Sequence, residues 1–147
     1  MQKENLKQQS LNGLKVRTTN QDEMTEGKGK IGSLWQSFFE TIAPNLKEDA
    51  LIYGVYSNYE SDHTGLFDVY AATNQPLNEQ KVETVDINEG QYLKFHKTGE
   101  MPQAVIELWT EVWNYFSDDN CQHERAYTTD FELYKGLDEV EIAIAIK

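Results

Sequence analysis

The sequence contains little cysteine and few basic residues for its size. Of its 147 residues only Cys121 is a cysteine, so no disulfide can form within the chain, and we expect a reducing compartment, the cytoplasm. Thirteen basic against 25 acidic side chains give a formal net charge of −12. Such a surface repels nucleic-acid phosphates and anionic lipids, so we expect no nucleic-acid binding by the chain itself, and cationic partners are favoured.

Long apolar runs and the common catalytic or metal motifs are also missing. No window approaches the roughly 18 apolar residues of a membrane span, and residues 1–9 lack a signal-peptide core. Cys121 and His123 stand two apart, but the other histidines are distant and no known zinc framework fits. There is no glycine-rich phosphate loop and no nucleophile elbow. We therefore predict a single domain with no membrane segment, metal site or cofactor.

The start of the chain is polar. Residues 1–12 hold only two leucines, and we expect them to form a mobile lead-in or a short helix before a domain of residues 13–147. Residues 19–30 contain three acidic residues, two glycines and no periodicity, and they are expected to form a long loop. Both segments are thus predicted to lie outside the regular elements.

Two segments have the apolar spacing of helices. The first begins at Ser33, which with Gln36 matches a capping box, and it ends before Pro44. The second begins after Pro102 and carries Val105, Trp109 and other apolar residues on one stripe. Strand patterns occupy the segments around them, at residues 14–18, 50–59, 67–71, 82–87, 91–97, 125–134 and 140–146.

The order of these elements repeats. Apart from the short piece at 82–87, the chain gives strand, helix, strand, strand, and then the same again about 70–77 residues later. This order predicts an α+β fold of duplicated β-α-β-β modules. We expect their two main helices to lie side by side on one antiparallel sheet, with a central ligand cleft between the halves.

The segment Asp130–Tyr134 is the strongest candidate for a site. A residue period of two places Phe131 and Leu133 on one face of a strand, and Asp130, Glu132 and Tyr134 on the other. The first face suits a core, and the second offers a carboxylate beside an aromatic ring. Glu132 is therefore the candidate charged floor of an aromatic pocket, with an ordinary solvated sheet face as the alternative interpretation.

Five stretches follow one another along the chain: residues 16–20 with Glu23, 30–38, 55–62, 90–95 with Gly99 and Trp109, and 130–134. Together they resemble the GyrI-like small-molecule-binding family, the bacterial transcription-activator effector-binding domains. The resemblance implies two modules related by a pseudo-twofold axis, with the ligand in the cleft between them. In multidrug-binding relatives, a glutamate that aligns with Glu132 meets the positive charge of the ligand.

The resemblance also implies a mode of action. Many family members are fused to a DNA-binding helix-turn-helix domain, for which residues 1–12 leave no room, so we expect a stand-alone protein. It is similar to the cationic drug-binding proteins encoded on mobile gene cassettes, which implies hydrophobic cations as partners. The residues expected to bind the ligand are Glu132, Trp35, Tyr53, Tyr70, Tyr92, Trp109 and Tyr134.

Two alternatives remain open from the sequence. Some relatives are reported as hydrolases, so Glu132 with Tyr92 or Tyr53 is a candidate acid–base pair, although the leading hypothesis includes no catalytic residue. The acidic chain is also a candidate regulator that binds a transcription regulator or another protein. Its acidic residues are spread along the sequence rather than massed on one segment, which argues against this second alternative.

Overall fold

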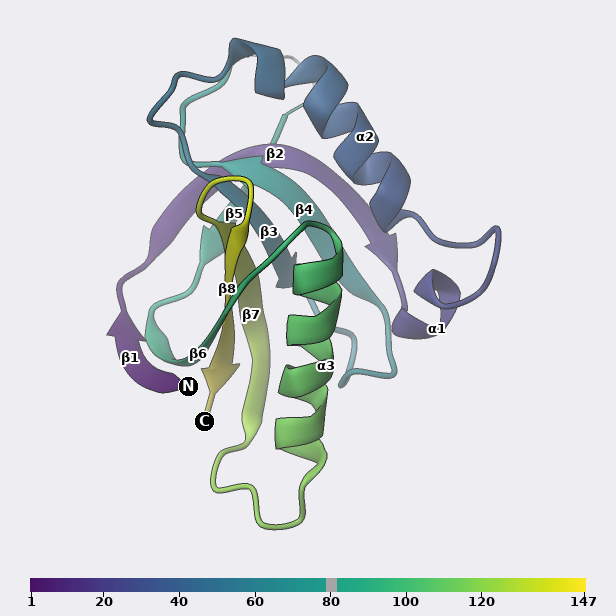
Figure 1. Cartoon of the computed structure of the whole chain (residues 1–147), viewed down its shortest axis with the longest axis vertical. Helices are drawn as coiled ribbons and strands as arrows, with labels where there is room; N and C mark the ends of the chain where they lie inside the picture. Colours follow the sequence, from purple (N-terminus) through teal and green to yellow (C-terminus); the bar gives the residue numbers. More distant parts are fainter. Residues whose placement is uncertain (79–81) are drawn as a thin grey trace.

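The computed structural model of the chain describes residues 1–78 and 82–147. Within them eight strands form one antiparallel sheet, on which two main helices lie (Figure 1). No helix of the described residues is long and apolar enough to cross a membrane. The elements are β1 Gln2–Leu6, β2 Gln9–Thr18, α1 Asn20–Glu23, α2 Ile31–Thr41, a 3-10 turn Ala43–Asn45, β3 Ile52–Ser57, β4 Phe67–Thr73, β5 Glu83–Ile87, β6 Gly90–Thr98, α3 Gln103–Ser117, β7 Arg125–Tyr134 and β8 Glu139–Ile146.

The strand order confirms the predicted duplication. Across the sheet the order is β1-β6-β8-β7-β3-β4-β2-β5, so β6, β8 and β7 of one half mirror β2, β4 and β3 of the other. Strands β3 and β7 meet at the centre, where Gly54 pairs with Glu132. The centre of the sheet is therefore the seam between the two halves.

Each half begins with a leading strand, and the two leading strands are exchanged. The second of them, β5, was predicted at residues 82–87, whereas β1 was not. β1 pairs with β6, while β5 pairs with β2, so each lies at the edge of the other half. The expected lead-in or helix at residues 1–12 was wrong: residues 2–6 are β1, and β2 begins at Gln9. An edge strand exposed along nearly its whole length needs no apolar residues, so the polar sequence gave no strand signal.

Each main helix covers the strands of its own half. Helix α2 packs mainly on β2 and β4, burying Leu34 and Phe38 against Val69. Helix α3 packs mainly on β6 and β8, burying Leu108 against Ile142. The central strands β3 and β7 therefore lie below the space between the helices (Figure 1).

The other face of the sheet forms a core of its own. Tyr53, Tyr70, Tyr92 and Phe131 are buried there with small and branched side chains of the central and edge strands. The strands bend strongly around this core, as β2 and β4 show in Figure 1. Alternation along β7 follows the prediction, because Phe131 belongs to this core and Glu132 faces the helices.

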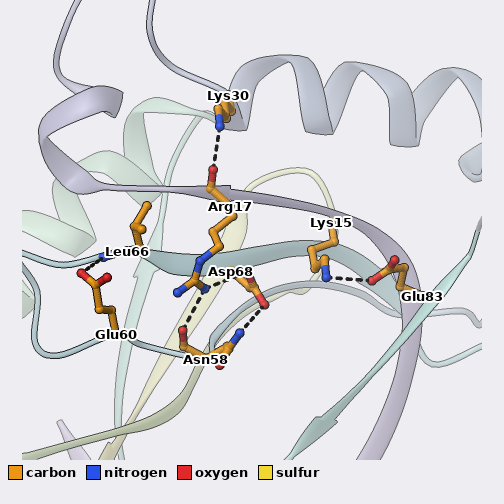
Figure 2. Close-up of polar contacts among 8 residues, drawn as sticks. All are labelled: Lys15, Arg17, Lys30, Asn58, Glu60, Leu66, Asp68 and Glu83. Atoms are coloured by element: carbon orange, nitrogen blue, oxygen red, sulfur yellow. Dashed lines mark hydrogen bonds and ion pairs between the residues drawn. The ribbon is translucent and has the colours of Figure 1, made fainter.

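The start of α2 differs from the prediction. The expected loop at 19–30 contains the short helix α1, and α2 begins after Lys30 without a side-chain cap from Ser33. Instead, the Glu23 carboxylate accepts hydrogen bonds from the backbone amides of Lys30 (2.8 Å) and Ile31 (3.1 Å). The Lys30 ammonium group also donates to the Arg17 carbonyl oxygen of β2 (Figure 2). This cap spans seven or eight residues, so the local capping-box pattern could not reveal it.

Candidate ligand-binding site

A cavity of about 620 Å³ lies between the two main helices, above the seam of the sheet. Helices α2 and α3 supply its side walls, and strands β3 and β7 supply its floor. Its lining is mostly apolar, and Glu132 is its only carboxylate among the described residues. The aromatic residues of the lining are Trp35, Phe39, Tyr56, Trp109 and Tyr134.

Glu132 is buried in the floor, with 3% of its surface exposed. Its Oε2 accepts hydrogen bonds from the Trp109 indole (2.6 Å) and the Tyr56 hydroxyl (2.8 Å), and its Oε1 accepts one from Tyr134 (2.8 Å). Burial raises the pKa of Glu132, and the three hydrogen bonds oppose that rise. Within the described residues Glu132 has no ion pair with a basic side chain, so nothing there neutralises its charge.

The three donors are themselves uncharged. Burial raises the pKa of Tyr134 and of Tyr56, and the neighbouring Glu132 raises both further, so both phenols keep their protons at neutral pH. The Trp109 indole has a donor and no acceptor. The network therefore holds the carboxylate in place without cancelling its charge, and a group that brings a positive charge into the cavity is electrostatically favoured.

A glycine on the neighbouring strand makes room for this carboxylate. Gly54 of β3 pairs directly with Glu132 of β7. A side chain at position 54 would therefore lie on the same face of the sheet as the Glu132 side chain. A Cβ at position 54 would collide with Oε1 of Glu132 and would lie 3.2 Å from Cζ2 of Trp35. The missing side chain thus lets the carboxylate and the Trp35 ring occupy the same part of the floor.

The structure brings together four of the seven side chains expected at the site: Glu132, Trp35, Trp109 and Tyr134. The expectation for Tyr53, Tyr70 and Tyr92 is corrected, because all three lie in the core on the opposite face of the sheet. Strand alternation is the cause, since Tyr53 and Glu132 stand on directly neighbouring strands but face opposite ways. The candidate acid–base pairs of Glu132 with Tyr92 or Tyr53 are therefore not formed.

The sequence reasoning missed Tyr56, which donates directly to Glu132. Residues Ile52, Gly54 and Tyr56 form one face of β3, and the glycine at its middle was the available signal of a close approach. Met101, Val105 and Ile106, from the start of α3 and the residues before it, add apolar wall to the cavity. The mouth includes exposed apolar side chains, of which Leu137 in the β7–β8 turn is 94% exposed.

Comparison with known proteins identifies one protein family. The family model described as Cass2, integron-associated effector binding protein, matches residues 4–146. An integron cassette protein from the mobile metagenome of Vibrio cholerae has a solved structure with a TM-score of 0.95 and 46% identity to this chain. The match covers 99% of this chain and 95% of the cassette protein.

Two more distant proteins match nearly the whole length of the chain. YobU of Bacillus subtilis (strain 168), named as a candidate transcriptional regulator, is 30% identical over 149 residues, which is 92% of this chain and 90% of YobU. The structure of SAV2435 bound to tetraphenylphosphonium has a TM-score of 0.74 at 23% identity, covering 99% of this chain and 93% of SAV2435. At that identity the likeness to SAV2435 concerns the fold.

Proposed function

The chain belongs to the family of integron-associated effector-binding proteins, and from this premise we propose that it binds amphipathic aromatic cations with Glu132 as their counter-charge. Membership of the family makes it a small-molecule-binding protein. The ligand class and the role of the glutamate are the proposal. The cavity between α2 and α3 is the proposed binding site.

The single observation that carries the proposal is the buried, uncompensated carboxylate of Glu132. Removing a charge from water without a counter-charge is unfavourable, and a bound cation relieves that penalty. Trp35, Tyr56 and Trp109 line the same cavity, and a ring whose face meets a cation adds about 0.5–2 kcal/mol to its binding. A neutral ligand gains only the packing, and an anion is repelled, so selectivity follows the sign of charge.

The solved relatives add support of a coarser kind. SAV2435, which shares the fold, is described in complex with tetraphenylphosphonium, a hydrophobic cation that carries four aromatic rings. A cavity of about 620 Å³ lies within the size range of small-molecule sites. Tetraphenylphosphonium is therefore a suitable first probe for this chain.

The experiment compares ligands of one shape and different charge. Tetraphenylphosphonium and tetraphenylborate are a matched cation and anion, and triphenylphosphine oxide is a neutral relative. We expect the wild-type protein to bind the cation and not the anion in titration calorimetry. Glu132→Gln keeps the shape of the side chain. It should lower the affinity for the cation at least about tenfold, because a charge contact of roughly 1.4 kcal/mol or more is lost.

The control variant is Glu141→Gln. Glu141 lies on β8, is 12% exposed at its side chain and pairs with Lys94 (3.3 Å) and Lys135 (3.2 Å), outside the cavity. Its substitution removes a carboxylate and should leave cation affinity unchanged. If Glu132→Gln lowered the affinity for the cation and for the phosphine oxide equally, the role of Glu132 would be structural and the proposal would fail.

A further inference from the structure

A second, smaller cavity adjoins the first along the seam of the sheet. It has a volume of about 250 Å³ and shares Ile31, Tyr56, Ile106 and Trp109 with the lining of the Glu132 cavity. The two cavities therefore form neighbouring compartments of one groove between the helices. The smaller one is distinguished by Arg125, the only arginine among the described residues that lines either cavity.

Arg125 has hydrogen-bond donors to spare. Its side chain is 8% exposed, and its Nη2 donates to Oδ2 of Asp130 at 2.7 Å. Its Nε is buried and has no acceptor among the described residues. The guanidinium carbon lies 4.5 Å from the centre of the Tyr127 ring, which holds the group in place. The charge of Arg125 is thus paired, but its donor capacity is not filled.

The backbone of β7 is distorted where it builds this compartment. The pairing of β7 with β8 changes register between Arg125 and Asp130, and Tyr127 within that interval has a φ of 54°. A bulky residue in the left-handed region is uncommon, and such strain concentrates at ligand sites. The irregularity lets the guanidinium group of Arg125 lie beside Asp130, five residues further along the same strand.

The two compartments are a short distance apart. Asp130 and Glu132 occupy alternate positions of β7 and face the same side, so their Cα atoms are about 7 Å apart along the strand. Tyr59 also donates to Asp130, next to the Tyr56 that donates to Glu132. A molecule with its charged head at Glu132 can therefore reach Arg125 with a tail of modest length.

We propose that the Arg125 compartment is a second subsite, which takes an uncharged oxygen acceptor such as a carbonyl on the tail of the ligand. This inference rests on the proposed function and narrows it to elongated cations that carry an oxygen acceptor on a tail. A carboxylate tail fits less well than a carbonyl. Asp130 already neutralises Arg125, and Glu23 lines the same compartment, so an anion there meets two negative groups.

The test uses two triphenylphosphonium probes with alkyl tails of equal length. One tail ends in a methyl ketone and the other in an isopropyl group, so the probes differ only in an oxygen acceptor. We expect the wild-type protein to bind the ketone probe about tenfold more tightly, because the oxygen receives a hydrogen bond from a charged donor. Equal affinity of the wild type for both probes would overturn the proposal without any variant.

The variant that removes the donor is Arg125→Met combined with Asp130→Asn, which leaves no unpaired buried charge. The asparagine oxygen still accepts from the Ala145 amide, as Asp130 does. We expect this variant to bind both probes equally. The matched control is Arg17→Met with Asp68→Asn, an arginine–aspartate pair of β2 and β4 at 3.0 Å that lines neither cavity (Figure 2). The control should keep the preference for the ketone.

Failure of this inference differs from failure of the proposed function. If both probes bind through Glu132 but the ketone preference is absent or survives the Arg125 substitution, the second subsite is wrong and cation binding stands. If neither probe binds, both proposals are overturned. As a measurement that needs no variant, the guanidinium N–H resonances of Arg125 in nitrogen-labelled wild-type protein should shift more with the ketone probe than with the isopropyl probe.

Discussion

Gly54 offers a stringent test of how the site is built. Changing it to alanine places a Cβ against Oε1 of Glu132, 3.2 Å from Cδ of the same side chain. The carboxylate must move away, which strains or breaks its hydrogen bond from Tyr134. Overpacking of this kind costs about 1–3 kcal/mol, and the strain on this hydrogen bond is part of that cost.

The opposing effect is smaller. Alanine restricts the unfolded chain more than glycine, which stabilises a protein by about 0.4–1 kcal/mol where the backbone tolerates it. We therefore expect Gly54→Ala to lower the free energy of unfolding by about 1–3 kcal/mol and to weaken binding of tetraphenylphosphonium. In a Glu132→Ala background the colliding group is gone, and the same glycine substitution should be neutral or slightly stabilising.

The assay is a double-mutant cycle in urea, followed by tryptophan fluorescence. The coupling between positions 54 and 132 should reach about 1–3 kcal/mol. Gly32→Ala is the control, because a Cβ there would meet nothing within 4 Å although Gly32 also lines the cavity. Additive effects at 54 and 132 would refute the argument that the glycine exists to accommodate the carboxylate.

Two further predictions concern pH and the cap of α2. Burial raises the pKa of Glu132, so the folded state holds this proton more tightly than the unfolded state. The free energy of unfolding should therefore fall as the pH rises above 4.5, the ordinary pKa of a glutamate, and level off above the pKa in the folded state. Denaturation from about pH 4 to about pH 8 should show this in the wild type and not in Glu132→Gln; identical profiles would contradict it. Glu23→Ala leaves the amides of Lys30 and Ile31 without their acceptor and should cost about 1 kcal/mol in the same assay, whereas no loss would mean that water caps the helix equally well.

The face of β7 that carries Glu132 could be predicted from local sequence, and its partners Trp109 and Tyr134 were among the expected ligand-binding residues, whereas Tyr56 was not. The alternation of Phe131, Glu132 and Leu133 determines which side chains share a face, and helical spacing placed Trp35 and Trp109 on the helices above. Strand β3 has large apolar or aromatic residues on both faces, including Tyr53 on one and Tyr56 on the other. Only the pairing of Gly54 with Glu132 shows which of these faces meets the helices.

The same limit explains the errors outside the site. The polar strand β1 is held by backbone pairing with β6, which lies far along the chain. Glu23 caps α2 from seven or eight residues upstream, beyond the three-residue spacing of a capping box. The repeat of helices and inner strands was predictable because these elements bury periodic apolar residues. The pairing of each leading strand with the other half is not encoded in any periodic pattern of apolar residues, so it could not be predicted.

That exchange limits how a ligand can enter. Strand β1 of the first half pairs with β6 of the second, and β5 of the second half pairs with β2 of the first. The two halves are therefore connected at both edges of the sheet as well as at its centre. The two halves cannot separate as rigid bodies without breaking the hydrogen bonds between paired strands. We therefore expect a bulky ligand to enter through local movement of side chains at the mouth of the cavity. The exposed apolar side chains there are Leu137, Phe39 and Ile106.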